Sequence, residues 1–427
     1  MFEIKYIVMN KLIAAVMTGL SVFSAYADGN HYIQGEISAG EQEVQPMGTE
    51  LSDGSHVMDP VEYWTVRNAG EFKNCFSTEY YKLVLSGKIN ADDVRALWRM
   101  SLDGILTEID LSDTEIEDGI FPANAFWHED EQHSGICGHP HNIRLRSIAL
   151  PSNTKEIGAE AFAHAITLEE IVLPEGLETI GDKAFHNTGL KEIELPNSFN
   201  EFKGTAQFKD CYSLCRISFP DGVKDIPDYF ANKCLNLKEI NIPSSVRTIG
   251  EHAFSECRSL PVLYLPEGVE SIGDYALWCC DAINVVVFPS TLKNIGERAC
   301  EFWAVNPERK IYSKAAVPPT CKMSNNDKTY GPFGNSLSNF QGNTWIATDI
   351  YVPKGTAGAY RSATGWNYFV NYIETDDFPD ASVDEIVKDD SADESAYYDL
   401  SGREVPHPQP GHLYVRKGKK VILSPAR

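Results

Sequence analysis

The stretch LKEINIPSSVRTIGEHAFSEC, residues 237–257, carries a pattern that recurs along the chain. It joins an apolar run that ends in proline to an Ile-Gly pair, a phenylalanine and a cysteine. The proline returns at steps of 23, 22, 24, 23, 23 and 23 residues, at Pro151, Pro174, Pro196, Pro220, Pro243, Pro266 and Pro289. Self-similarity at this period predicts a solenoid, in which each coil buries its apolar faces by stacking on its neighbours.

Each position of the repeat has a physical role. In the run L-x-x-I-x-L, the apolar residues face the interior and the x residues face outward. Proline ends the strand because it lacks the N–H for a further ladder bond. Glycine permits either an unusual backbone conformation or a close approach by another segment. An aromatic residue or its substitute fills the interior, at Phe162, Phe185, Phe208, Phe230, Phe254, Leu277 and Cys300. The pattern therefore predicts parallel strands in one concave sheet above a buried aromatic row.

The repeat resembles the BspA-type leucine-rich repeat family, whose pattern is close to L-x-x-I-x-L-P followed by I-G-x-x-A-F-x-x-C. Leu237–Pro243, Ile249-Gly250, Ala253-Phe254 and Cys257 match it almost residue for residue. The chain departs from the pattern at Pro227, where glycine is usual, and by an extra residue before Gly204. The resemblance covers about residues 60–375. It implies a secreted or surface protein of anaerobic bacteria, and some members of the family act in adhesion.

The N-terminus has the layout of a secretory signal over residues 1–27, with Met9 as the expected true start. Lys11 supplies a positive charge, residues 12–23 form an apolar run, and Ala25-Tyr26-Ala27 offers a cleavage site. The run is too short to span a bilayer. We therefore expect a secreted or surface-located protein without a membrane span.

Further segments flank the repeats. The predicted order is a polar lead-in at 28–60, an N-terminal α/β cap with a first degenerate repeat at 61–126, a His-rich insertion at 127–142, leucine-rich repeats at 143–305, closing coils at 306–375, an acidic linker at 376–396 and a C-terminal strand pair at 397–427. In the cap, Asn90 is expected to begin a helix that ends at Met100. The C-terminal strand pair resembles tails of exported proteins, and is either a sorting signal or a plain hairpin.

Ten cysteines in a chain predicted to be exported point to disulfides. Four of them, however, recur at the repeat's own period, at Cys211, Cys234, Cys257 and Cys280. Coils stacked about 4.8 Å apart would satisfy the Cα spacing of a disulfide. Small thiols also suit a crowded interior. The ladder is therefore either a row of buried thiols, which is our prediction, or a row of disulfides.

The His-rich insertion contains a cluster of potential metal ligands, at His128, His133, Cys137, His139 and His141. Such residues could hold a Zn²⁺-like ion. The two histidines that flank Glu129 to Gln132 are five residues apart, however, and not four as in a helical H-E-x-x-H site. Nearby glycines and Pro140 indicate a loop. We predict a polar insertion between the first two coils, with no metal and no cofactor.

The net charge of −24 argues against nucleic acid as a partner. The chain contains no G-x-S-x-G, P-loop or dinucleotide-binding motif. A glycosidase pair could be hidden among outward carboxylates, but a solvated acidic face is the simpler interpretation of Glu169, Glu170, Glu192, Glu194 and Glu239. We predict a non-enzymatic protein. The alternatives are a surface hydrolase of glycans or peptides, which would use the acidic face or the His-rich insertion, and a purely structural envelope component.

The outward positions of the last two coils form an apolar patch, Val262, Tyr264, Val285 and Val287. An exposed apolar patch on a soluble protein usually marks a contact. The contact here is either a ligand or the segment 306–350 folded back over the sheet. The sequence therefore predicts an exported binding or adhesion protein whose partner is a host or microbial surface protein or polysaccharide.

Overall fold

The structure, a computed structural model, forms two compact units. The N-terminal unit contains the chain up to Val223 and residues Pro227–Glu239, and the C-terminal unit contains Lys224–Ile226 and the chain from Ile240 onward. The described residues are 32–37, 46–47, 61–72, 80–103, 105–126, 144–302, 309–324, 330–335, 348–379, 386–389, 397–398, 404–405, 413–416 and 419–423. The predicted signal segment and the His-rich insertion, with all five candidate metal ligands, lie outside these residues.

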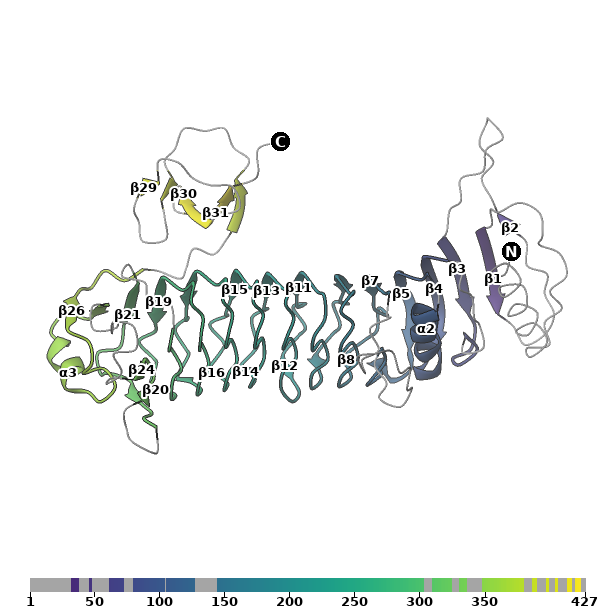
Figure 1. The fold of residues 1–427 in the computed structure, drawn as a ribbon. Coiled ribbons are helices and arrows are strands. Elements are labelled where there is room, and N and C mark those ends of the chain that lie inside the picture. Colours follow the sequence, from purple (N-terminus) through teal and green to yellow (C-terminus); the bar gives the residue numbers. More distant parts are fainter. Residues whose placement is uncertain are drawn as a thin grey trace, which may run out of the picture. The chain divides into compact units, whose positions relative to one another are not determined.

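The N-terminal unit is a parallel β-solenoid (Figure 1). Its main sheet has the strand order β2-β1-β3-β4-β5-β7-β9, and every neighbouring pair is parallel except β1 with β2. The strands are β1 (Tyr32–Ile37), β2 (Pro46–Met47), β3 (Val61–Val66), β4 (Lys82–Ile89), β5 (Glu108–Ile116), β7 (Ser147–Ala149) and β9 (Glu170–Val172). The next coils add β11 (Glu192–Glu194) and β13 (Arg216–Ser218), which also pair in parallel.

Each coil also contributes a second, shorter strand, which the sequence pattern did not predict. In the N-terminal unit these strands form a parallel sheet in the order β12-β10-β8-β6. They are β6 (Ile120–Phe121), after the short helix η2 (Glu117–Gly119), and β8 (Glu156–Ile157), β10 (Thr179–Ile180) and β12 (Glu201–Phe202). The coils are therefore held by two parallel sheets, and not by the single sheet expected.

The helix expected in the cap is α2 (Ala91–Asp103), which continues three residues beyond the predicted end at Met100. Asn90 Oδ1 accepts hydrogen bonds from the backbone N–H groups of Asp92 and Asp93, at 3.0 and 3.3 Å. Asp93 Oδ2 accepts one in return from the backbone N–H of Asn90, at 3.0 Å. This reciprocal arrangement satisfies the free donors of the first turn. The apolar face of the helix is buried, with Val94 and Leu97 fully enclosed.

The C-terminal unit is also a parallel β-solenoid, with main-sheet order β17-β19-β21-β25-β26 and short-strand order β14-β16-β18-β20-β22. The main strands are β17 (Val262–Tyr264), β19 (Val285–Phe288), β21 (Lys310–Ser313), β25 (Asp349–Val352) and β26 (Asn371–Glu374). The short strands are β14 (Asp225–Ile226), β16 (Thr248–Ile249), β18 (Ser271–Ile272), β20 (Asn294–Ile295) and β22 (Thr320–Cys321). Other elements are β15 (Glu239–Asn241), the hairpin β23 (Tyr330–Gly331) and β24 (Gly334–Asn335), and helix α3 (Ala357–Ser362).

A separate sheet near the C-terminus has the order β27-β31-β30-β28-β29. Its strands are β27 (Ile386–Asp389), β28 (Tyr397–Tyr398), β29 (Glu404–Val405), β30 (Leu413–Arg416) and β31 (Lys419–Leu423). Strand β27 pairs in parallel with β31. Part of the segment predicted to be an acidic linker, 376–396, therefore forms a strand, and that strand begins with the apolar pair Ile386-Val387.

The repeat glycines are required by a close approach between coils. A Cβ placed on Gly158, Gly181, Gly273 or Gly296 would lie 2.4 to 2.6 Å from a backbone nitrogen of the preceding coil. None of these four glycines has a positive φ, so the left-handed conformation is not the reason for their presence. Gly204, after the extra residue, differs because its φ is 76°. Of the two roles considered for the glycine, close approach is the one that the regular coils use.

The predicted aromatic row exists in the N-terminal unit, where Phe162, Phe185 and Phe208 stack with centroid separations of 5.4 and 5.3 Å and nearly parallel rings. Phe230 also fills the interior, as predicted, but it does so in a different register. The backbone N–H of Phe208 donates to the carbonyl of Phe230, so Ala231 is the residue in register with Phe208. The order Phe-Ala replaces Ala-Phe in this coil. The Phe230 ring therefore meets Phe208 edge to face, at 5.3 Å and 77°.

Candidate binding surfaces

The structure brings the four predicted patch residues together on β17 and β19. Val262 lies opposite Val285, and Tyr264 lies opposite Val287. Val262 and Tyr264 are half-buried, whereas Val285 and Val287 are only 7% and 1% exposed. The expectation of exposure therefore fails for the two valines of β19, because the aromatic side chains of neighbouring strands pack against them.

Those neighbours extend the patch into a C-terminal row, which consists of Tyr264, Val287, Tyr312 and Tyr351 in adjacent strands. The rings of Tyr312 and Tyr351 stack at 4.4 Å. Burial raises the pKa of Tyr264 and of Tyr312 to about 12, so both phenols are neutral at physiological pH. The row combines apolar ring surface with hydroxyl groups, a composition that is common at binding surfaces.

Part of the chain itself packs against the C-terminal row. Strand β21, within the segment 306–350, joins the sheet as a further strand. Phe378 follows the last strand of the sheet and packs on the cluster of Val285, Val287 and Tyr312, with its ring edge to face with Tyr312 at 6.5 Å. Sequence reasoning missed this contact because it placed Phe378 in a linker.

An N-terminal row of outward side chains lies on the main sheet of the other unit. The repeat pattern places two of its members, Ala149 and Val172, at outward positions, but sequence reasoning missed the other three. The register aligns five residues in adjacent strands: Tyr63, Val84, Asp110, Ala149 and Val172. Tyr63 is 44% exposed and Val172 is 63% exposed, although both are large and apolar. Three of the five strands belong to the cap, where no repeat consensus indicates register. Only the strand pairing identifies these residues as neighbours.

The acidic positions predicted for the outer face are partly neutralised by ion pairs between coils. Arg216 Nη2 donates to Glu192 Oε2 at 2.5 Å. Lys191 Nζ donates to Glu169 Oε2 at the same distance, and this hydrogen bond and charge lower the pKa of Glu169. A glycosidase needs one carboxyl group whose pKa is raised. Glu169 has the opposite shift, so it gives the hydrolase hypothesis no support.

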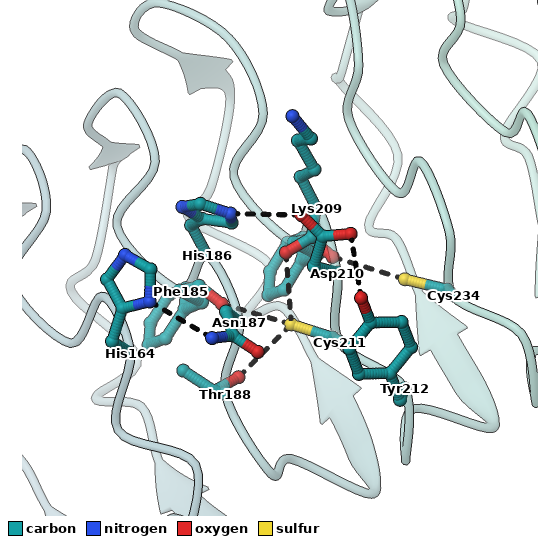
Figure 2. Close-up of polar contacts among 11 residues, drawn as sticks. His164, Phe185, His186, Asn187, Thr188, Lys209, Asp210, Cys211, Tyr212 and Cys234 are labelled. Carbon is teal, nitrogen blue, oxygen red and sulfur yellow. Dashed lines mark hydrogen bonds and ion pairs between the residues drawn. The ribbon is translucent and has the colours of Figure 1, made fainter. Parts of the chain in front are cut away.

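Polar side chains connect the coils beside the aromatic column (Figure 2). His164, Asn187 and Asp210 occupy equivalent positions, two residues after each phenylalanine, and their φ values are 62°, 55° and 60°. Asn187 Nδ2 lies 3.0 Å from His164 Nδ1, and His186 Nε2 lies 3.1 Å from Asp210 Oδ2. Burial raises the pKa of Asp210, but the hydrogen bond from His186 and the charge of Lys209 together lower it by more. The net shift of the pKa is therefore downward. These contacts join three successive coils.

The cysteine ladder consists of free thiols in the structure, with Cys211 and Cys234 in the N-terminal unit and Cys257 and Cys280 in the C-terminal unit. All four side chains are buried. Cys211 Sγ donates to the carbonyl of Phe185 at 3.0 Å, and Cys234 Sγ donates to the carbonyl of Phe208 at 3.1 Å (Figure 2). Burial raises the pKa of Cys211 to about 11. Cys211 and Cys234 therefore pack in the interior and donate hydrogen bonds, and Cys211 is a poor nucleophile.

We expect iodoacetamide to modify Cys215 faster than Cys211 or Cys234 in the folded protein at neutral pH. Cys215 is half-buried, whereas the other two are fully enclosed. Mass spectrometry of peptides after timed alkylation would measure the three rates, with urea-unfolded protein as the control in which they become similar. A disulfide-linked peptide that contains Cys211 and Cys234 would contradict the free-thiol assignment.

Two further observations concern metals and membranes. Within the described ranges, no group of three or more His, Cys, Asp and Glu side chains is arranged to hold a metal ion. Over the same part of the chain, none of the helices combines the length and the apolar character needed to cross a bilayer.

A comparison with protein families identifies the repeats. The model of the BspA-type leucine-rich repeat region matches in 6 copies, over residues 141–245 and 224–305. No curated protein gives a significant match. Among solved structures, a leucine-rich repeat protein from Bacteroides ovatus is 20% identical, with a TM-score of 0.36, over 58% of this chain and 78% of that chain. A T. pallidum leucine-rich repeat protein is 25% identical, with a TM-score of 0.31, over 45% and 72%. A leucine-rich cell surface protein from Faecalibacterium prausnitzii is 18% identical, with a TM-score of 0.24, over 62% and 84%.

Proposed function

Because residues 141–305 are BspA-type leucine-rich repeats, we propose that this chain is an exported, non-enzymatic binding protein that presents its solenoid to a surface protein or polysaccharide. Repeat scaffolds of this kind use their interior positions for stacking between coils and leave the outward positions for recognition. In this chain the repeat's leucine, isoleucine, phenylalanine and cysteine side chains are mostly enclosed, which leaves the x positions of the strands for contact with a partner.

The observation that carries the proposal is the partly exposed portion of the C-terminal row, Tyr264 and Tyr351, together with Val262. Between the two tyrosines, Val287 and Tyr312 are buried and serve as the packed base of this surface. Val262 and Tyr264 remain partly exposed at one end of it. Aromatic side chains at outward positions are enriched where proteins bind other molecules.

Export is supported by the sequence of residues 1–27, with its positive charge, apolar run and small-residue cleavage site. An exported solenoid with a broad outer sheet would suit adhesion to host or microbial surfaces.

We expect the double variant Val262→Ser with Tyr264→Ala to weaken ligand binding at least tenfold, since apolar contact area worth about 1.4 kcal/mol or more would be lost. The ligand would come from an array of host matrix proteins and bacterial or dietary polysaccharides. Affinity would then be measured by biolayer interferometry, with thermal melting to verify folding.

Val317→Ala is the matched control, because Val317 is 79% exposed in the same unit and lies outside the C-terminal row. The control should bind as the wild type does. Equal affinity of the double variant and the control would remove this surface as the site, and an array without any saturable interaction would refute the binding function itself.

A further inference from the structure

The N-terminal row lies beside a second, polar row on the same sheet face. Two residues earlier in each strand, the register aligns Val61, Lys82, Glu108, Ser147 and Glu170. Alternation places both rows on the outward face, while Leu83, Ile109 and Ile148 between them are buried. From β4 to β9, each strand therefore presents one residue of the N-terminal row and one polar residue side by side.

The dimensions of this double row follow from strand geometry. Adjacent strands lie about 4.8 Å apart, and residues two apart along one strand lie about 6.6 Å apart. The five strands therefore offer a strip about 19 Å long, which crosses them at right angles. It is low next to β9, because β7 contributes the small side chains of Ala149 and Ser147. Its two ends are raised by the exposed Tyr63 and Val172.

We propose that this double row binds a linear, uncharged polysaccharide of β-linked hexopyranose units, which lies across the strands. Each unit of such a chain has an apolar C–H face and a rim of equatorial hydroxyl groups, and its repeat is close to the spacing between strands. One sugar per strand then rests its apolar face on the N-terminal row, with Tyr63 as the aromatic platform at one end. Its hydroxyl groups reach the polar row.

The polar row supplies both kinds of hydrogen-bonding group. Lys82 Nζ lies 3.5 Å from Glu108 Oε2, and the two side chains are 34% and 40% exposed. A hydroxyl group can donate to the carboxylate and accept from the ammonium group at the same time. Asp110 adds a carboxylate within the N-terminal row, held by the Ser112 hydroxyl at 2.6 Å. With Glu170 this makes the strip net acidic, which disfavours anionic polysaccharides.

A folded protein fits this strip less well than a sugar chain does. Protein interfaces bury about 800 Å² on each partner around a central apolar anchor in a pocket. Here the two exposed large apolar side chains stand at the ends, and the central strand, β5, presents the carboxylates Glu108 and Asp110. The assignment rests on the proposed binding function, but it uses a face in the other unit from the C-terminal row, so the two fail or succeed separately.

Isothermal titration calorimetry of the full chain with cellohexaose, mannohexaose and chitohexaose tests the proposal. At least one hexamer should bind, and its disaccharide should bind at least tenfold more weakly, because it spans fewer strands. Dextran, which is α-linked, and hyaluronan, which is anionic, should not bind. Tyr63→Ala and Val172→Ser should each weaken the hexamer about tenfold without lowering the melting temperature by more than a few degrees.

Ile166→Ala is the matched control, since Ile166 is 42% exposed in the same unit but belongs to neither row. It should leave the affinity unchanged. The proposal is overturned if none of the three hexamers binds, or if both row variants bind as tightly as the control does. It is also overturned if Tyr63→Ala abolishes binding of a protein ligand and leaves every sugar unaffected. Because two different row residues are replaced, poor folding of one variant still leaves the other informative.

Discussion

Phe185→Ala is expected to lower the free energy of unfolding by about 3–5 kcal/mol. Phe185 is fully buried, between the rings of Phe162 at 5.4 Å and Phe208 at 5.3 Å. The coils on both sides are fixed by backbone hydrogen bonds, such as the one from the Phe185 N–H to the carbonyl of Gln207 at 2.9 Å. They cannot close the space that a missing ring leaves, so the full cost of a cavity remains. Urea titration followed by circular dichroism would measure the loss in the transition of the N-terminal unit.

Phe185→Leu provides the comparison for this variant. Leu277 occupies the equivalent repeat position in the C-terminal unit and is also fully buried, so the site accepts leucine. We expect Phe185→Leu to cost about 1.5 kcal/mol or less. If the alanine variant were as stable as the leucine variant, the aromatic column would not be a main source of stability.

Gly181→Ala is expected to destabilise the protein by about 1–3 kcal/mol, although it adds a single methyl group. The new Cβ would lie 2.6 Å from the backbone nitrogen of Ala159 and 2.8 Å from the carbonyl carbon of Gly158. Both atoms belong to the backbone of the preceding coil, so relief requires a shift of one whole coil relative to the next. The same urea titration would report the change.

Gly176→Ala is the matched control, because its Cβ would meet only the carbonyl oxygen of Thr154, at an ordinary 3.9 Å. Its φ is not in the left-handed range. Alanine should therefore be neutral there, or stabilising by about 0.4–1 kcal/mol through the unfolded state. Similar losses at the two positions would show that backbone entropy, and not contact between coils, explains the effect at Gly181.

Much of the fold was predictable because the repeat encodes it locally. The period, the inward leucine and isoleucine positions, the strand-ending proline and the helix that begins after Asn90 all follow from short-range spacing. Phe230 is buried as predicted, but the exchange of two adjacent residues moved its ring out of register with Phe208. The repeat pattern tolerates a shift of one residue in the sequence, but ring stacking does not.

The binding surfaces were less predictable than the fold. The sequence located Val262, Tyr264, Val285 and Val287 on outward positions, but the extent to which neighbouring side chains enclose the two valines depends on residues far along the chain. Phe378 is separated from Val285 by the whole closing region, and its charged surroundings gave no sign that it returns to the sheet.

The sequence by itself determined the repeat length, the parallel coils and the types of residue inside them, because each coil repeats the same local instructions. The strand pairing of the cap, by contrast, was needed to align Tyr63, Val84 and Asp110 with the outward repeat positions Ala149 and Val172. Strand register in the non-repetitive cap is set by packing between segments that are distant in sequence. Those long-range contacts leave no periodic trace in the residues themselves.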